Sequence, residues 1–248
     1  MRLILASASP RRAELLRAAG FPFETCAVDV DERVHAGETA ASYVRRLAAE
    51  KSALAAIAVR GPAREGPAKV GRHVQNGPAE AGRHGQEGPA KAGHYVQTHN
   101  VQTHPPSTAQ QVVVLGADTA VVIDGEILGK PRDNGDAAAM LRRLSGRRHD
   151  VMTGVSVRVG VQEVGRVETT AVYFVPLSPA EIAWYVASGE GRDKAGAYAA
   201  QGLASRFIPR IEGSYSNVVG LPLGCVYELL KELGVDYSGG QSGSGKSL

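Results

Sequence analysis

Gly116-Ala117-Asp118-Thr119-Ala120-Val121-Val122-Ile123-Asp124-Gly125-Glu126-Ile127-Leu128-Gly129-Lys130-Pro131 is the stretch of sequence that decides the fold. The apolar run before it predicts a strand that carries Asp118 to its end. A second apolar run turns at Asp124-Gly125, a strong hairpin signal because a type I′ turn needs positive φ at both central positions. The returning strand leads to Lys130, so the hairpin brings a carboxylate and an ammonium toward each other. That arrangement suits phosphoryl chemistry; the alternative is an ordinary surface hairpin.

The length, net charge and cysteine count limit the class of protein to which the chain can belong. Its 248 residues are enough for one sizeable domain or two small lobes. A net charge of +3, from 28 basic and 25 acidic residues, is too small to indicate a nucleic-acid binder. Cys26 and Cys225 have no CxxC partner, which predicts a reducing compartment without a disulfide framework or a zinc site. The first residues resemble a strand more than a signal peptide, and no stretch has the length of a membrane span. We therefore expect a soluble cytoplasmic protein with no nucleic-acid or membrane partner.

A strand, a serine-rich turn and a helix are predicted at the start of the chain. Ser9 is a good N-cap, Pro10 suits the first helical position and Gly20 is a good stop. Arg11 and Arg12 fall in the first helical turn, where the helix dipole disfavours cations. Two arginines there indicate an anion site, for example for a triphosphate. The alternative is a solvated arginine pair.

An acidic cluster and a long helix follow a second predicted strand at residues 21–30. The cluster contains Glu32 and could hold a divalent cation or form a polar loop. The helix is predicted from Ala40 to about Ile57, with an apolar face at helical spacing that includes Leu54. Lys51 lies near that face and taken alone resembles a surface lysine whose stem covers apolar groups.

The second half of the chain alternates helices and strands. A capping box at Ser178 opens a helix in which Trp184 is expected to be a packing residue. The small residues of 193–202 allow a backbone to approach a ligand closely. The remaining predicted elements are a helix at 134–144, antiparallel strands at 149–159 and 167–175, a strand at 207–211 and a final helix at 223–233.

Residues 58–110 differ in composition from the rest. Gly-Pro recurs with a period of eleven residues and apolar side chains are few, so the segment cannot form a core and is predicted to be a disordered, low-complexity insertion. Five of the seven histidines fall in it, which leaves a metal- or nucleic-acid-binding adaptor as an alternative. We expect deletion of the insertion to leave folding and activity unchanged. The tail, 237–248, contains the letters of a phosphate loop, but no helix can follow it, and its composition predicts a flexible Gly/Ser tail.

Several separated pieces of the chain, taken in order, resemble the Maf (septum-formation-inhibitor) family of nucleoside triphosphate pyrophosphatases. The resemblance covers residues 2–57 and 111–236, and implies one domain, 1–236, interrupted by the insertion. It implies an α/β fold of the Maf/ITPase-like kind, with a mixed twisted sheet, flanking helices and two lobes around a nucleotide cleft. The matching pieces are Ser7-Ala8-Ser9-Pro10-Arg11-Arg12, Gly116-Ala117-Asp118-Thr119, Leu128-Gly129-Lys130-Pro131, Leu144-Ser145-Gly146 with His149, Asp193-Lys194-Ala195-Gly196-Ala197-Tyr198 with Gln201-Gly202, and Asn217-Val218-Val219-Gly220-Leu221-Pro222.

The resemblance also implies an activity, which is hydrolysis of a nucleoside triphosphate to the monophosphate and pyrophosphate with Mg²⁺ or Mn²⁺. Asp118 matches the proton acceptor that prepares the attacking water, and Asp118 and Glu32 are the expected metal ligands. A carboxylate beside a divalent cation can orient water, which agrees with that role. The expected phosphate contacts are Ser7, Ser9, Arg12, Lys51, Lys130 and Lys194.

The segment after Asp193 is similar to the branch of the family that acts on dTTP and UTP. Arg11, Thr119 and Gln201 match the positions linked to base choice, and a glutamine amide can pair with the carbonyl and N–H edge of a pyrimidine. Ala200 departs from the bulkier apolar residue common in that branch. The alternatives are another nucleotide, such as 7-methyl-GTP or a modified pyrimidine triphosphate, and a non-catalytic nucleotide-binding regulator of cell division. The resemblance allows a homodimer.

Overall fold

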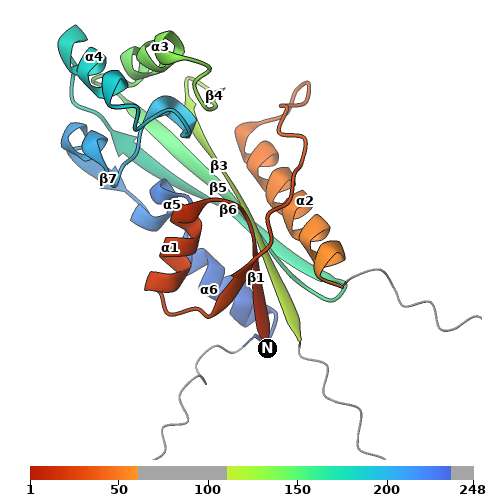
Figure 1. The fold of residues 1–248 in the computed structure, drawn as a ribbon. Coiled ribbons are helices and arrows are strands. Elements are labelled where there is room, and N and C mark those ends of the chain that lie inside the picture. The colour runs from red at the N-terminus through yellow and green to blue at the C-terminus, as the bar shows by residue number, and fades with distance from the viewer. Residues whose placement is uncertain (61–110, 236–248) are drawn as a thin grey trace, which may run out of the picture. The chain divides into compact units, whose positions relative to one another are not determined.

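The computed structural model describes residues 1–60 and 111–235, which form a seven-stranded mixed sheet flanked by helices (Figure 1). The strand order is β2-β1-β3-β5-β6-β7, and β4 also pairs with β3. The predicted α/β class with a mixed sheet is confirmed. The strands are β1 (Arg2–Ala6), β2 (Phe23–Thr25), β3 (Val112–Ile123), β4 (Glu126–Leu128), β5 (Arg148–Val159), β6 (Gln162–Tyr173) and β7 (Arg210–Glu212). The helices are α1 (Pro10–Ala18), α2 (Ala40–Arg60), α3 (Asn134–Leu144), α4 (Pro179–Ser188), α5 (Tyr215–Val219) and α6 (Leu223–Glu232), with 3₁₀ turns η1 (Ala195–Ala197) and η2 (Leu203–Phe207).

Strand β3 is the centre of this sheet. One edge of it pairs antiparallel with β5 from Val113 to Val122. The other edge is shared by two short strands: β1 pairs in parallel up to Gly116, and β4 pairs antiparallel from Val121. No described strand pairs with residues 117–120 on that edge. The sheet therefore has an opening beside the middle of β3.

Asp118 lies beside this opening, and the prediction that it ends a strand is wrong. β3 runs for 12 residues without interruption. The strand continues past Asp118 because β5 pairs with it on both sides of that residue, and it is the neighbouring β1 that ends. The predicted hairpin turn is confirmed, with φ values of 55° at Asp124 and 76° at Gly125.

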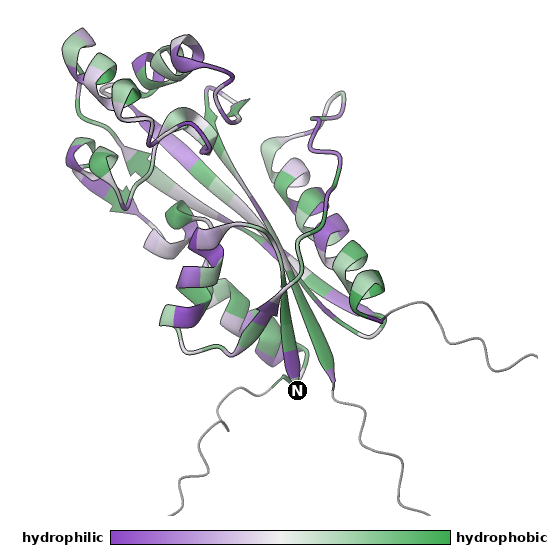
Figure 2. Ribbon diagram, in the orientation of Figure 1, coloured by the Kyte–Doolittle hydropathy of each residue, from purple (hydrophilic) through white to green (hydrophobic). Residues whose placement is uncertain are grey.

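Apolar side chains of β3 alternate between the two faces of the sheet, as the period of a strand requires. On one face they join two cores, one with α1 and α6 around Leu115 and one with α3 and α4 around Val121. On the opposite face, Val114 and Ala120 belong to smaller clusters under α2. Figure 2 shows apolar residues along the central strands and on the helix faces turned to them. The long strands β3 and β5 thus hold the two cores together, with the opening between them.

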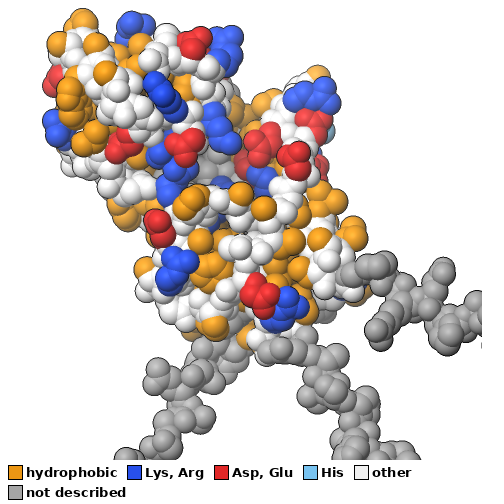
Figure 3. Space-filling model, in the orientation of Figure 1, with side chains coloured by type: hydrophobic (Ala, Val, Ile, Leu, Met, Phe, Trp, Pro, Cys, Tyr) orange, Lys and Arg blue, Asp and Glu red, His pale blue; other side chains and the backbone are white. Residues whose placement is uncertain are grey.

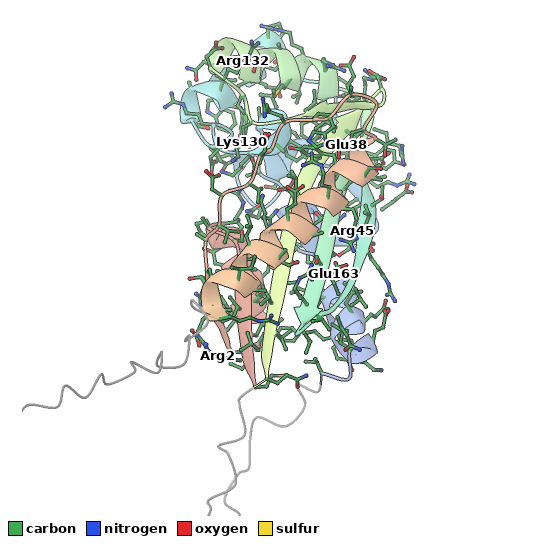
Figure 4. All side chains as sticks on the ribbon, turned by 90° about the vertical axis from the view of Figure 1, so that its right-hand side faces the viewer. Arg2, Glu38, Arg45, Lys130, Arg132 and Glu163 are labelled. Atoms are coloured by element: carbon green, nitrogen blue, oxygen red, sulfur yellow. The ribbon has the colours of Figure 1, made fainter. Side chains whose placement is uncertain are left out.

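Helix α2 lies close against β3 and β5 because both strands have a glycine beneath it. A Cβ at Gly116 would collide with the Ala48 carbonyl oxygen, and one at Gly154 would collide with that of Val44. Arg45 of α2 also donates to Glu163 of β6 at 2.8 Å, a pair labelled in Figure 4. The close approach brings the buried face of α2 against the middle of β3.

Two predicted strands are shorter than expected. β2 covers only Phe23–Thr25 of the predicted 21–30, since β1 pairs with just those three residues. In the predicted strand 207–211, Phe207 instead ends η2 and enters the core near α4, and only Arg210–Glu212 pairs with β6. Both strands are short because the neighbouring strand, β1 for β2 and β6 for β7, pairs with only three of their residues.

One residue predicted on the buried face of α2 lies at the surface. Leu54 is 42% exposed, because the buried face of α2 instead contains Lys51, Ser52 and Ala56. Trp184 packs as predicted, although its side chain is 43% exposed. Its ring meets that of Phe207 edge-on at a centroid distance of 6.4 Å, and the guanidinium of Arg206 lies 4.4 Å from its ring centroid.

Helix α2 continues to Arg60, three residues beyond its predicted end at Ile57. The rest of the predicted insertion, 61–110, and the tail lie outside the described residues. None of the helices in residues 1–60 and 111–235 has both the length and the apolar character that a membrane span requires.

We expect Gly116→Ala to lower the free energy of unfolding by about 1–3 kcal/mol, because the added methyl group forces α2 away from β3. Urea unfolding followed by circular dichroism measures this change. Gly224→Ala is the matched control, since a Cβ at that position in α6 meets no atom within 4 Å and alanine favours a helix. Equal stability of the two variants would contradict the close packing of α2 on β3.

Candidate active site

A cleft of about 580 Å³ lies at the opening beside β3, within the size range of small-molecule sites. Its walls come from the turn after β1, the loop before α2, α2 itself, the turn after β4 and residues 193–201. Figure 3 shows a hollow on this face with basic and acidic side chains gathered around it. All the site residues predicted from the sequence line this cleft: Ser7, Ser9, Arg11, Arg12, Glu32, Lys51, Asp118, Thr119, Lys130, Lys194 and Gln201.

Lys51 joins the two predicted acidic residues. Its Nζ donates to Asp118 Oδ1 at 2.7 Å and to Glu32 Oε1 at 2.8 Å. Lys51 and Asp118 are each only 8% exposed. The interpretation of Lys51 as a surface lysine is therefore wrong, since the glycines under α2 bring that face of the helix onto β3. Asp118 faces α2, and Thr119, next along the strand, faces α1 on the other side of the sheet.

Glu32 is carried by the loop between β2 and α2, which is fastened to the helix. Arg46 donates to Glu38 Oε1 at 2.7 Å and to the Arg33 carbonyl at 3.0 Å. The hydrogen bonds from Arg46, together with the His35 N–H, lower the pKa of Glu38 to about 2. Burial disfavours the charged form of Glu32, but the hydrogen bond and charge of Lys51 outweigh it, so the pKa of Glu32 is lowered. The loop thus presents an ionised carboxylate to the cleft.

Tyr43 is a cleft residue that the sequence reasoning missed. Its hydroxyl donates to the Glu32 carbonyl at 2.9 Å, and its side chain lines the cleft. Burial, followed by the charges of Asp118 and Glu32, raises the pKa of Tyr43 to about 12. Its spacing of eight residues from Lys51 puts both on one helical face, which is the signal that could have found it.

Arg12 links three segments around the cleft. Its guanidinium donates to the Gly220 carbonyl at 2.8 Å, to Thr119 Oγ1 at 3.0 Å and to Ser7 Oγ at 3.2 Å. Burial is the main cause of its lowered pKa. No carboxylate in the described part of the chain forms an ion pair with Arg12, so the cleft holds a half-buried cation whose charge an anion can balance.

Ser9 lies at the start of α1 in extended conformation, as predicted for an N-cap, with Pro10 in the first helical position. Its side chain makes no capping hydrogen bond. Its backbone N–H instead donates to Ser7 Oγ at 3.1 Å. The serine-rich turn is thereby folded onto the end of β1, with both serines lining the cleft.

The opposite wall is built around Asp193, a second residue that the sequence reasoning did not assign. Arg11 reaches it at 3.4 Å and Lys194 Nζ at 2.6 Å. Lys130 comes from the turn after β4 and lines the cleft without direct contact to Asp118. The side-chain amide of Gln201 is exposed to the cleft and has no hydrogen-bond partner among the residues that the structure describes.

Tyr198 forms part of the cleft floor and rests on His149. The His149 Nε2 and the Tyr198 hydroxyl are 2.8 Å apart, and Phe174 packs edge-on against both rings. Burial, with a smaller effect of Arg148, lowers the pKa of His149 to about 4. The imidazole is therefore neutral near pH 7 and shares one hydrogen bond with the tyrosine hydroxyl. This pair fixes the start of the segment that carries Gln201.

The carboxylates have the donor chemistry of a magnesium or manganese site, although no group of three or more acidic, histidine or cysteine residues forms a ready metal cage in residues 1–60 and 111–235. Mg²⁺ commonly takes one or two carboxylates and completes its shell with water and substrate phosphates. Asp118 and Glu32, which share the Lys51 ammonium, fit that pattern. A carboxylate pair at one end of a cleft lined with cations can bind a polyphosphate and position water.

Comparisons with known proteins agree with this geometry. The chain matches the family model of Maf-like proteins over residues 2–233. It is 44% identical to a dTTP/UTP pyrophosphatase of Anaeromyxobacter sp. (strain Fw109-5), across 94% of this chain and 90% of that protein. It is 40% identical to a protein of the same name from Symbiobacterium thermophilum, across 98% and 99%, and 43% identical to one from Shewanella sp. (strain MR-7), across 95% and 100%.

We expect acidification to destabilise the protein through His149. In the folded chain the pKa of His149 is lowered from 6.5 to about 4. Between these two pH values His149 therefore binds a proton in the unfolded chain but not in the folded chain. The stability conferred by the neutral imidazole is complete above pH 6.5 and is lost as the pH falls toward 4, by up to about 3 kcal/mol.

Urea unfolding of the wild type and of His149→Gln at pH 7 and pH 4 measures this effect. The variant should lose less stability between the two pH values, because glutamine does not titrate. His35→Gln, the same change at an exposed loop histidine, should behave as the wild type does. An unchanged pH dependence in His149→Gln would contradict the assignment.

Proposed function

Because this chain belongs to the Maf-like protein family, we propose that it is a dTTP/UTP pyrophosphatase, which hydrolyses these triphosphates to the monophosphate and pyrophosphate. The observation that supports this best is the buried Asp118 carboxylate at the end of a cleft whose other walls carry unpaired or partly paired cations. The relatives with that activity match the chain along almost its full length.

Asp118 accepts the proton of the attacking water in this proposal. The water oxygen forms a bond to the α-phosphorus while the bond from that phosphorus to the bridging oxygen breaks, and pyrophosphate leaves with the electron pair. Lys51 holds the carboxylate in place through a direct hydrogen bond. The 2.7 Å contact also orients one Asp118 oxygen toward α2 and leaves the other for water.

The triphosphate lies among the cations of the cleft. Arg12 supplies a half-buried positive charge, and Lys130 and Lys194 supply charges from the opposite wall. Ser7 and Ser9 offer hydroxyl groups on the turn after β1. Together these groups balance the charge that builds on the phosphates as the bond breaks.

Asp118 and Glu32 are the residues that would hold a divalent cation, Mg²⁺ or Mn²⁺. Such an ion neutralises phosphate charge and lowers the pKa of a water bound to it. Lys51 is the counter-ion of both carboxylates in the described structure, so it would share their charge with a bound cation.

Base choice is assigned to Arg11, Thr119 and Gln201. Thr119 Oγ1 already bonds Arg12 and Thr153, and Arg11 pairs with Asp193. Of the three, only Gln201 has a side chain without a hydrogen-bond partner among the described residues. Its amide can offer an acceptor and a donor to a pyrimidine edge. We therefore assign the main reading of the base to Gln201.

The alternatives are another nucleotide substrate, such as 7-methyl-GTP or a modified pyrimidine triphosphate, and a nucleotide-binding regulator without catalysis. A pure binder would not require a buried carboxylate beside the phosphate site, which favours the enzyme. A homodimer, a cytoplasmic location and the absence of nucleic-acid and membrane partners remain predictions.

We expect Asp118→Asn to lower kcat for UTP by about a thousandfold, since the amide cannot accept the proton. Nucleotide binding should largely persist, because the cations are unchanged. Pyrophosphate release from a panel of nucleotides with magnesium measures this. Asp124→Asn is the matched control: it makes the same change in an exposed turn residue bonded to Arg147, and should keep full activity. Release of orthophosphate by the wild type would overturn the reaction, and an active Asp118→Asn would remove that residue from its role.

We expect removal of divalent cations by a chelator to abolish turnover and added Mg²⁺ to restore it. Glu32→Gln should require more Mg²⁺ for half-maximal rate, because one of two anionic ligands is lost. Glu24→Gln makes the same change at an exposed residue that bonds Arg2 outside the cleft; it is the control and should leave that concentration close to the wild-type value. Full turnover in chelator would contradict the proposed metal.

A further inference from the structure

We propose that Tyr185 and Glu190 are specificity-determining positioning residues, which fix the turn that presents Gln201 to the nucleotide base. The inference rests on the proposed function, because it gives Gln201 the role of reading the base. Neither residue lines the cleft, so both act through the turn.

The two side chains hold the backbone on both sides of Gln201. The Tyr185 hydroxyl accepts a hydrogen bond from the Ala199 N–H at 3.1 Å, two residues before Gln201. It donates to Glu190 Oε2 at 2.7 Å. Glu190 Oε1 in turn accepts from the Leu203 N–H at 2.8 Å, two residues after Gln201. A single chain of hydrogen bonds therefore spans the turn from behind.

These hydrogen bonds are anchored in a rigid part of the fold. Tyr185 is 1% exposed and packs with Phe207 in the core around α4, with ring centroids 5.9 Å apart. The turn lies directly on the Glu190 carboxylate, because a Cβ at Gly202 would collide with it. The position of the Gln201 backbone is thus set by the buried Tyr185 phenol and the Glu190 carboxylate, which both bond the backbone of the turn directly.

Glu190 also connects the base side of the cleft to the phosphate side. Its backbone carbonyl accepts from Lys194 Nζ at 2.6 Å, while its side chain holds Leu203. One residue thereby sets the distance between a phosphate contact and the base-reading turn. A site built to hydrogen-bond a base edge discriminates strongly only if its donor and acceptor are held in place.

The test compares UTP with ribose 5-triphosphate, which has the same sugar and phosphates and no base. Tyr185→Phe removes both hydrogen bonds of the hydroxyl. We expect kcat/KM for UTP to fall about tenfold, the scale of one lost hydrogen bond in a polar site, while kcat/KM for ribose 5-triphosphate stays within about twofold. Glu190→Gln retains only one acceptor oxygen and should fall between the wild type and Tyr185→Phe.

Tyr173→Phe is the matched control. The Tyr173 hydroxyl also donates to a glutamate, Glu212 Oε2, at 2.7 Å, but it lies on β6 outside the cleft. This variant should keep the wild-type ratio of the two substrates. Urea unfolding of all variants identifies any that do not fold, and Glu190→Gln carries the test if Tyr185→Phe is among them.

A double variant shows whether Tyr185 acts through Gln201. In a Gln201→Ala background, Tyr185→Phe should cause no further loss of UTP preference, because the group being positioned is gone. Equal losses for both substrates, or losses that add in the double variant, would overturn the inference.

Binding measurements separate this inference from the proposed function. If the wild type releases no pyrophosphate from UTP, the proposed function fails. The same substrate comparison by equilibrium titration still decides the inference: a selective loss of UTP affinity in Tyr185→Phe supports it, and an unchanged affinity ratio contradicts it.

Discussion

The shared edge of β3 is the constraint on which the rest of this structure depends. Two short strands pair with that edge from opposite ends, and their combined length leaves residues 117–120 without a partner there among the described strands. The other edge stays paired with β5 from Val113 to Val122, so the strand continues without interruption past the opening. The opening lets Asp118 and Thr119 of a central strand line the cleft, and a strand within a sheet is a rigid place to build a site. Because side chains alternate along a strand, Asp118 meets α2 on one face and Thr119 meets α1 on the other.

The charges around the opening depend on one another. Two carboxylates and one ammonium lie within hydrogen-bond distance, and Asp118 and Lys51 are both buried. Breaking such a pair would leave a buried charge without its partner, which costs several kcal/mol. The glycines at 116 and 154 matter for this reason, since they allow α2 to come close enough for Lys51 to reach both acids. Arg12 has no such partner among the described residues, and that imbalance is what favours an anionic ligand.

The two sides of the cleft are built differently. Asp118, Lys51 and Arg12 lie on regular elements, which are β3, α2 and α1. The wall that carries Gln201 is an irregular segment whose order comes from side chains behind it: the His149–Tyr198 pair at its start, and Tyr185 with Glu190 around Gln201. Irregular backbone needs such support because no ladder of hydrogen bonds fixes it.

The sequence by itself determined the features that short stretches encode. Asp124-Gly125 requires a tight turn through its backbone conformation, Ser178 and Glu181 cap a helix, and apolar periodicity located most elements. The family resemblance also named the residues that line the cleft. Only the tertiary structure decided that Asp118 lies within a strand, that Lys51 is buried, that Tyr43 and Asp193 line the cleft, and that Glu190 lies behind the turn of Gln201. Those facts depend on strand pairing and on the distance between α2 and the sheet. Both are set by partners far away in the chain, which local sequence signals do not report.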